Sequence, residues 1–204
     1  MSGEFLHTIG SVDQLPDLFK GSFLKGRPEP RIAMVGRSNV GKSTLINALI
    51  GTRLAQTSAE PGKTRKLHLY LWKEAKRVVV DLPGYGFAKA GHADREDWAN
   101  FIQAYFHADG GLELALVLLD ARHGPTELDL QAIGYLIDQG IPLRFVFTKA
   151  DAIKGQSERA SRKKEAAVAL TKLGANPDEA FWVSAKDKDL GLKKLSDWVS
   201  QARK

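Results

Sequence analysis

The sequence predicts an α/β protein built on one largely parallel sheet with helices on both of its faces. Short apolar runs of strand length alternate with segments whose apolar residues recur at helical spacing, which is typical of right-handed strand–helix–strand crossovers. The 204 residues, 43% hydrophobic and 26% charged, suit one soluble domain. We expect a loosely packed lead-in at residues 1–30 and the main domain at residues 31–204.

The apolar runs give the expected strands. They lie at residues 31–36, 67–72, 77–81, 114–120, 143–148 and 181–184. A short turn separates the runs at 67–72 and 77–81, and polar or glycine-rich loops are expected at 52–65 and 82–92. Because open α/β sheets bind ligands at the carboxyl ends of their strands, the residues that follow these runs are candidates for a site.

Helical patterns fall between the strands. Trp98, Phe101, Ile102 and Tyr105 are spaced to form one apolar helix face. Thr126 is placed to cap a helix that runs to about residue 139. Further helices are expected at residues 42–50, 157–173 and 190–202.

The composition excludes several classes of protein. Without cysteine the chain has no disulfide, no thiolate metal site and no cysteine nucleophile. The sequence contains no run of 18 apolar residues, so it predicts no transmembrane helix. The first residues, MSGEFLHTIG, lack the basic and apolar regions of a signal peptide. We therefore expect a cytoplasmic protein that makes no contact with a membrane.

Residues 36–43, GRSNVGKS, match the phosphate-binding pattern G-x-x-x-x-G-K-[ST] between a predicted strand and a predicted helix. The glycines allow the loop's N–H groups to point at phosphate oxygens, beside the helix N-terminus. Lys42 would place its charge on the β- and γ-phosphates, and Ser43 would supply an oxygen to Mg²⁺. The candidate phosphate-binding residues are Gly36, Arg37, Ser38, Asn39, Val40, Gly41, Lys42, Ser43 and Thr44.

This loop alone does not distinguish ATP from GTP. Residues 148–151, TKAD, match [NT]-K-x-D, in which Asp151 can accept hydrogen bonds from the guanine N1–H and 2-amino group. Adenine lacks both donors and would leave the carboxylate unpaired. The Lys149 stem can cover the base plane. The base-recognition candidates are Thr148, Lys149, Ala150, Asp151, Val183, Ser184, Ala185 and Lys186, the last three forming an S-A-K motif.

A fourth segment, Asp81, Leu82, Pro83 and Gly84, matches D-x-x-G. With it, the order of motifs resembles the translation-factor class of GTPases. That resemblance implies that Asp81 holds a water on Mg²⁺ and that the Gly84 N–H meets the γ-phosphate. Thr148 stands where many relatives have asparagine, which predicts fewer bonds tethering the phosphate loop and weaker nucleotide binding. Tyr85 stands where Ras-type enzymes have the glutamine that orients water. Either Tyr85 leaves the site to be completed by a partner or it packs the loop; both predict weak hydrolysis by the protein alone.

The stretches GRSNVGKS (36–43), T-S-x-x-P-G-K-T (57–64) and DLPGYGFAK (81–89) together resemble the EngB/YihA/YsxC family of small bacterial GTPases. The resemblance runs from about residue 30 to the C-terminus. It implies a Ras-like GTP-binding domain at 31–204, with six strands, one of them antiparallel, and five main helices. It also implies GTP hydrolysis to GDP, a role in assembly of the large ribosomal subunit, and a link to cell division.

The resemblance assigns roles to particular residues. Thr64 corresponds to the first-switch threonine, so the expected Mg²⁺ ligands are Ser43, Thr64 and Asp81, and the expected catalytic residues are Lys42, Thr64 and Gly84. The remaining first-switch candidates near the nucleotide are Gly62, Lys63, Arg65 and Lys66. Asn39 resembles the asparagine with which some related GTPases hold K⁺; alternatively, it satisfies backbone groups of its own loop.

The net charge of +6 is concentrated in residues 52–77 and 152–204. These segments would suit phosphate-rich ribosomal RNA, although they could equally be solvated lysine faces. We expect a monomer that binds the RNA and proteins of the large ribosomal subunit. Two alternatives are a switch for a protein partner in septation without stable RNA contact, and an ATP-using small-molecule kinase. The T-K-x-D and S-A-K motifs argue against the kinase.

Overall fold

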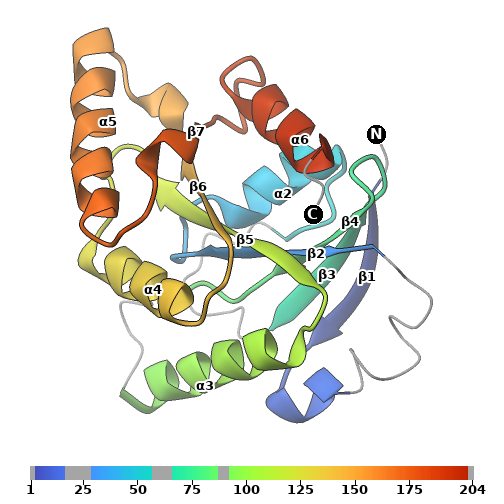
Figure 1. Ribbon diagram of the computed structural model, residues 1–204. Coiled ribbons are helices and arrows are strands. Elements are labelled where there is room, and N and C mark those ends of the chain that lie inside the picture. The colour runs from blue at the N-terminus through green and yellow to red at the C-terminus, as the bar shows by residue number, and fades with distance from the viewer. Residues whose placement is uncertain (1–2, 17–28, 57–65, 87–91, 202–204) are drawn as a thin grey trace.

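A seven-stranded sheet forms the centre of the protein (Figure 1). The computed structural model describes residues 3–16, 29–56, 66–86 and 92–201. The strand order is β1-β3-β4-β2-β5-β6-β7. The strands are β1 (Gly3–Ile9), β2 (Arg31–Gly36), β3 (Leu67–Trp72), β4 (Arg77–Asp81), β5 (Leu112–Asp120), β6 (Leu143–Thr148) and β7 (Phe181–Trp182).

One strand of this sheet, β3, runs against the others. It pairs antiparallel with both β1 and β4, whereas β2, β4, β5, β6 and β7 pair in parallel. The expectation of a mostly parallel α/β fold with one antiparallel strand is therefore confirmed. The expected strand count is wrong by one, because β1 was not foreseen.

Helices cover both faces of the sheet (Figure 1). One buried apolar cluster joins the sheet to α2 and α6, and the other joins it to α3, α4 and α5. Alternate residues of β2 enter opposite clusters, as the pleat of a strand requires. The helices are α2 (Lys42–Ile50), α3 (His92–Ala108), α4 (Glu127–Asp138), α5 (Gln156–Thr171) and α6 (Leu192–Gln201). Within the described part of the chain, none is long and apolar enough to cross a membrane.

Residues 3–16, which belong to the loosely packed lead-in that the sequence predicts, pack against the sheet. Residues 3–9 add β1 to the edge of the sheet, and Ile9 and Leu15 are buried in the apolar cluster that also contains residues of α3, α4 and α5. An edge strand has one hydrogen-bonding neighbour and keeps part of its surface in solvent, so it needs no continuous apolar run. Phe5, for example, is 48% exposed. The pairing of β1 with β3 also shifts register between Phe5 and His7, which further weakens the periodic pattern of apolar residues.

Most other boundaries agree with the sequence, and the exceptions have local causes. The strands at 31–36, 67–72, 77–81 and 143–148 and the helix at 42–50 lie at the expected residues. Thr126 caps α4 as expected, in a capping box with Asp129. Strand β7 ends before Ser184, because the Ser184 hydroxyl accepts hydrogen bonds from the backbone N–H groups of Lys186 and Asp187 and turns the chain.

Candidate functional site

The phosphate-binding candidates connect β2 to α2 at the carboxyl edge of the sheet. Gly41 has a φ of 104°, a left-handed conformation that glycine adopts without strain, and it directly precedes α2. Asn39 also has a positive φ, of 63°, which asparagine tolerates better than most residues. The first turn of α2 holds no acidic residue. The loop therefore presents backbone N–H groups and a helix N-terminus, a combination that attracts phosphate.

Two charged side chains meet beside this loop. Lys42 Nζ lies 3.6 Å from Asp81 Oδ1 at the end of β4. Asp81 is buried, and Oδ1 has no hydrogen-bond partner among the described residues. Burial raises the pKa of Asp81, and the nearby charge of Lys42 only partly opposes that rise. The site therefore contains a desolvated carboxylate oxygen directly beside the phosphate loop.

The D-x-x-G segment is packed directly against the phosphate loop. The Ser38 N–H donates a hydrogen bond to the Tyr85 carbonyl at 2.9 Å. A Cβ on Gly84 would lie 2.9 Å from the Ser38 backbone nitrogen, so only glycine fits this approach. Leu82 and Pro83 are buried between these contacts and β4. The backbone at Gly84 therefore lies directly against the phosphate loop, and its expected contact with the γ-phosphate stays a prediction.

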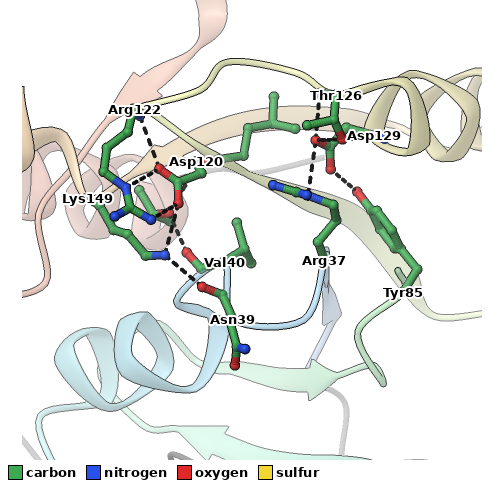
Figure 2. Close-up of polar contacts among 11 residues, drawn as sticks. Arg37, Asn39, Val40, Tyr85, Asp120, Arg122, Thr126, Asp129 and Lys149 are labelled. Atoms are coloured by element: carbon green, nitrogen blue, oxygen red, sulfur yellow. Dashed lines mark hydrogen bonds and ion pairs between the residues drawn. The ribbon is translucent and has the colours of Figure 1, made fainter. Parts of the chain in front are cut away.

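Tyr85 does not direct its hydroxyl toward the phosphate loop. The hydroxyl donates to Asp129 Oδ1 at 2.7 Å, and the side chain is buried (Figure 2). Burial and the neighbouring carboxylate raise the pKa of Tyr85 far above its ordinary value, so the phenol stays protonated. Tyr85 therefore does not replace the water-orienting glutamine.

On the opposite side, the T-K-x-D segment is tethered to the phosphate loop. The Thr148 hydroxyl donates to Val40 O at 2.6 Å, with Leu119 O at 3.2 Å. Lys149 Nζ donates to Asn39 O at 2.7 Å (Figure 2). Thr148 thus keeps a tether in spite of its difference from asparagine. Because a hydroxyl has only one hydrogen, the expected weaker nucleotide binding stays a prediction.

Asp120, at the end of β5, organises this side and was missed by the sequence reasoning. It is 4% exposed and accepts hydrogen bonds from Lys149 Nζ at 2.9 Å and from Arg122 Nε and Nη2 at 2.9 and 2.7 Å. Burial would raise the pKa of Asp120, but these bonds together hold it well below its ordinary value. Its position at a strand end, as for Asp81 and Thr148, was the signal available in the sequence.

The guanine-recognition candidates lie next to each other. Lys149 has a φ of 58°, and Asp151 follows with an exposed carboxylate. The Ala150 N–H donates to Val183 O at 3.1 Å, which joins this segment to the S-A-K motif. Ser184 is fully buried and fixes the turn that carries the half-buried Ala185. The two motifs are therefore held next to each other by a backbone hydrogen bond.

The contacts above bring four segments together at the carboxyl ends of the strands. These are the phosphate loop and the D-x-x-G, T-K-x-D and S-A-K segments. The first-switch segment is different, because most of it lies outside the described residues. These are Gly62, Lys63, Thr64 and Arg65, so their expected roles stay predictions. Lys66 is described and is exposed directly before β3, and Thr44 is exposed in the first turn of α2.

Comparison with known proteins identifies the family. A family model described as 50S ribosome-binding GTPase matches residues 31–149. A probable GTP-binding protein EngB from Desulfovibrio desulfuricans is 46% identical over 143 residues, covering 70% of this chain and 71% of the relative. The chain belongs to the EngB family of GTP-binding proteins. Another EngB protein, from Ligilactobacillus salivarius, is 43% identical over 180 residues and covers 86% and 87% of the two chains.

The fold of the chain also matches that of an EngB protein. A crystal structure of a probable GTP-binding protein EngB has a TM-score of 0.65 and 25% identity, covering 85% of this chain and 100% of that one. The predicted Ras-like fold, GTP and GDP binding and GTPase activity are thereby confirmed for this EngB-family chain. The ATP-using kinase does not fit a GTP-binding family.

Proposed function

We propose that this EngB-family GTPase is a GTP-dependent switch in assembly of the large ribosomal subunit. One observation carries the proposal: residues 31–149, which span the phosphate loop, D-x-x-G and the start of T-K-x-D, match the family model described as 50S ribosome-binding GTPase. Charge supports it, because α5 and α6 carry exposed lysines suited to RNA phosphates. These are Lys163, Lys164, Lys193 and Lys194.

The site residues divide the work of hydrolysis. Lys42 and the N–H groups of the loop stabilise negative charge on the phosphates, which is the main contribution proteins make to phosphoryl transfer. The Gly84 N–H faces the γ-phosphate. Asp151 selects guanine. Because the Tyr85 hydroxyl is bound to Asp129, the chain itself supplies no water-orienting side chain at that position. We therefore propose slow hydrolysis alone and faster hydrolysis when a partner completes the site.

The residues at the phosphate site fit Mg²⁺. Asp81 Oδ1 is a buried carboxylate oxygen without a hydrogen-bond partner among the described residues. Ser43 follows Lys42 in the first turn of α2, and Lys42 Nζ lies 3.6 Å from that oxygen. Oxygen donors of this kind, together with phosphates, are the ligands that Mg²⁺ prefers. Ser43 and Asp81 would hold the ion, with Thr64 as the proposed third residue. When bound, Mg²⁺ supplies positive charge to the phosphate oxygens.

A monovalent cation is a further proposed component of the site. Asn39 is exposed in the phosphate loop while its carbonyl is held by Lys149. This leaves the side-chain oxygen of Asn39 available for K⁺ near the phosphates. We expect faster turnover in K⁺ than in Na⁺ at equal ionic strength, and equal rates in the two salts would remove this proposal.

The test of the ribosomal role is co-sedimentation with purified large subunits at fixed salt. A non-hydrolysable GTP analogue, GDP and no nucleotide should be compared, with isolated small subunits as the control for non-specific attraction to RNA. The proposal predicts binding to large subunits with the GTP analogue and release with GDP. Binding in no state, or equal binding to both subunits, would contradict it.

A second candidate function is a switch for a protein partner in septation. It predicts that a protein is captured in a nucleotide-dependent manner and that this capture survives RNase treatment and high salt, whereas the ribosomal function predicts loss of binding under both.

We further propose that the protein works in the cytoplasm as a monomer. Light scattering in solution should then give a mass near 22.4 kDa.

A further inference from the structure

A buried polar cluster joins the D-x-x-G segment to the first turn of α4 (Figure 2). Its centre is Asp129, whose side chain is almost completely buried. Asp129 Oδ2 accepts hydrogen bonds from the Thr126 N–H at 2.8 Å and the Thr126 hydroxyl at 2.7 Å. Oδ1 accepts from the Tyr85 hydroxyl at 2.7 Å. The carboxylate that caps α4 thus also binds the residue that follows Gly84.

The charge of Asp129 makes this cluster sensitive to the loss of a partner. Arg37 Nε lies 3.4 Å from Asp129 Oδ2 and brings a cation from the phosphate loop. A buried carboxylate is stable only while donors and cations surround it, so removing one of them is costly. Burial and Asp129 raise the pKa of Tyr85 far above the physiological range, so its hydroxyl remains a donor. Asp129 therefore holds three parts of the chain: Tyr85, Arg37 and its own helix cap.

Tyr85 is held at both of its ends. Its hydroxyl is bound to α4, and its carbonyl accepts a hydrogen bond from the Ser38 N–H in the phosphate loop at 2.9 Å. Gly84 directly precedes it and lies so close to Ser38 that a Cβ would be 2.9 Å from the Ser38 nitrogen. A displacement of the Tyr85 ring would therefore move the peptide that carries the Gly84 N–H.

We propose that Asp129 is a positioning residue for GTP hydrolysis, which acts through Tyr85 to hold Gly84 against the phosphate loop and couples α4 to the γ-phosphate side of the site. The inference rests on the GTPase activity of the family and not on the ribosomal role. A failure of ribosome binding would therefore leave it unaffected. A displacement of about 1 Å in the position of a reacting group can slow a reaction by as much as about a hundredfold.

The cleanest variant is Tyr85→Phe, which removes the hydroxyl and keeps the ring that packs in the core. The matched control is Tyr135→Phe on α4, whose buried hydroxyl has no hydrogen-bond partner in the described structure. For both proteins we would measure single-turnover GTP hydrolysis and the affinities for a non-hydrolysable GTP analogue and for GDP. We expect Tyr85→Phe to hydrolyse GTP about tenfold more slowly. Its preference for the analogue over GDP should fall about threefold, while Tyr135→Phe matches the parent.

A double-mutant cycle tests whether Asp129 acts through Tyr85. The Asp129→Asn variant keeps the shape of the side chain and loses its charge. If the two residues work as a unit, the Tyr85→Phe/Asp129→Asn protein should be no slower than the slower single variant. Fully additive losses would contradict action through Tyr85. Should Asp129→Asn fail to fold in thermal melts, Tyr85→Phe decides the question alone.

Two results with Tyr85→Phe would overturn the proposal. One is a hydrolysis rate and a nucleotide preference equal to those of the parent. The other is an equal loss of affinity for both nucleotides with an unchanged hydrolysis rate, which would show that the hydroxyl only stabilises the fold.

Discussion

Two buried aspartates end the strands on either side of β2, and their surroundings are opposite. Asp81 ends β4, faces Lys42 at 3.6 Å, and has an Oδ1 without a hydrogen-bond partner among the described residues. Asp120 ends β5 and is surrounded by donors from Lys149 and Arg122. Burial raises the pKa of Asp81, whereas the donors overcome burial and lower the pKa of Asp120.

This difference divides the site into two sides. On the permanent side the polar groups are already paired within the protein, whereas on the discriminating side a ligand has to complete the pairing. On the Asp120 side, the side chains that tether the base-recognition segment already have their partners within the protein. On the Asp81 side, Lys42 only partly offsets the cost of burying an acceptor that has no hydrogen-bond partner among the described residues, and ligands can offset the rest. We infer that the first side binds any guanine nucleotide, and that the second side distinguishes GTP from GDP.

The largest expected effect comes from Asp81→Asn. Removal of a phosphate-side ligand should slow GTP hydrolysis about a hundredfold. The free energy of unfolding should stay unchanged or rise by about 1 kcal/mol, because a buried and poorly paired charge is lost. Single-turnover assays and urea denaturation would measure both, with the exposed Asp138→Asn on α4 as the control. Destabilisation by more than about 1 kcal/mol would show that Asp81 is compensated like Asp120.

Asp120→Asn should have the reverse profile. The variant replaces an acceptor of charged hydrogen bonds with an amide, and the free energy of unfolding should fall by about 2 kcal/mol. Affinities for GTP and GDP should weaken together because Lys149 loses its anchor, while hydrolysis at saturating GTP changes little. Urea denaturation and isothermal titration calorimetry are the measurements. A free energy of unfolding equal to that of the parent would contradict this prediction. It would show that water stabilises the charges of Arg122 and Lys149 as well as Asp120 does.

The pH dependence of stability sharpens the same contrast. The pKa of Asp120 is lowered in the folded protein from an ordinary value of 3.8. Below that value the unfolded chain binds a proton that the folded protein does not, so this stabilisation is complete at neutral pH and is lost as the pH falls. The difference in unfolding free energy between the parent and Asp120→Asn should therefore shrink by about 1 kcal/mol from pH 6 to pH 2. A constant difference over that range would contradict the assignment.

A smaller effect is expected from Thr148→Val, which is nearly isosteric and leaves Val40 O without its donor. Nucleotide affinity should weaken about fivefold for GTP and GDP alike, as expected for one net hydrogen bond of about 1 kcal/mol. Thr148→Ser is the control, because it keeps the hydroxyl and should bind like the parent. A change limited to GTP would place Thr148 on the discriminating side instead.

The sequence could predict which segments meet at the carboxyl ends of the strands, because each of these segments is local. Short motifs such as GRSNVGKS and TKAD place donors and acceptors within a few residues at the end of a strand, and the strands themselves are marked by apolar runs. The partners that connect these motifs are not local. Asp129 is 44 residues from Tyr85, and Asp120 is 29 from Lys149, so only the folded sheet reveals those bonds. Strand β1 was not predicted for another reason. An edge strand with little buried surface has little periodic pattern of apolar residues.

The division of the site into a permanent side at Asp120 and a discriminating side at Asp81 can be tested most directly by one ratio of affinities. The affinity for a non-hydrolysable GTP analogue, divided by the affinity for GDP, should be measured in the parent, Asp120→Asn and Asp81→Asn. We predict that Asp120→Asn weakens both affinities and leaves the ratio unchanged, whereas Asp81→Asn lowers the ratio. A ratio that changes in Asp120→Asn, or stays at the parent's value in Asp81→Asn, would contradict the separation of a permanent side from a discriminating side.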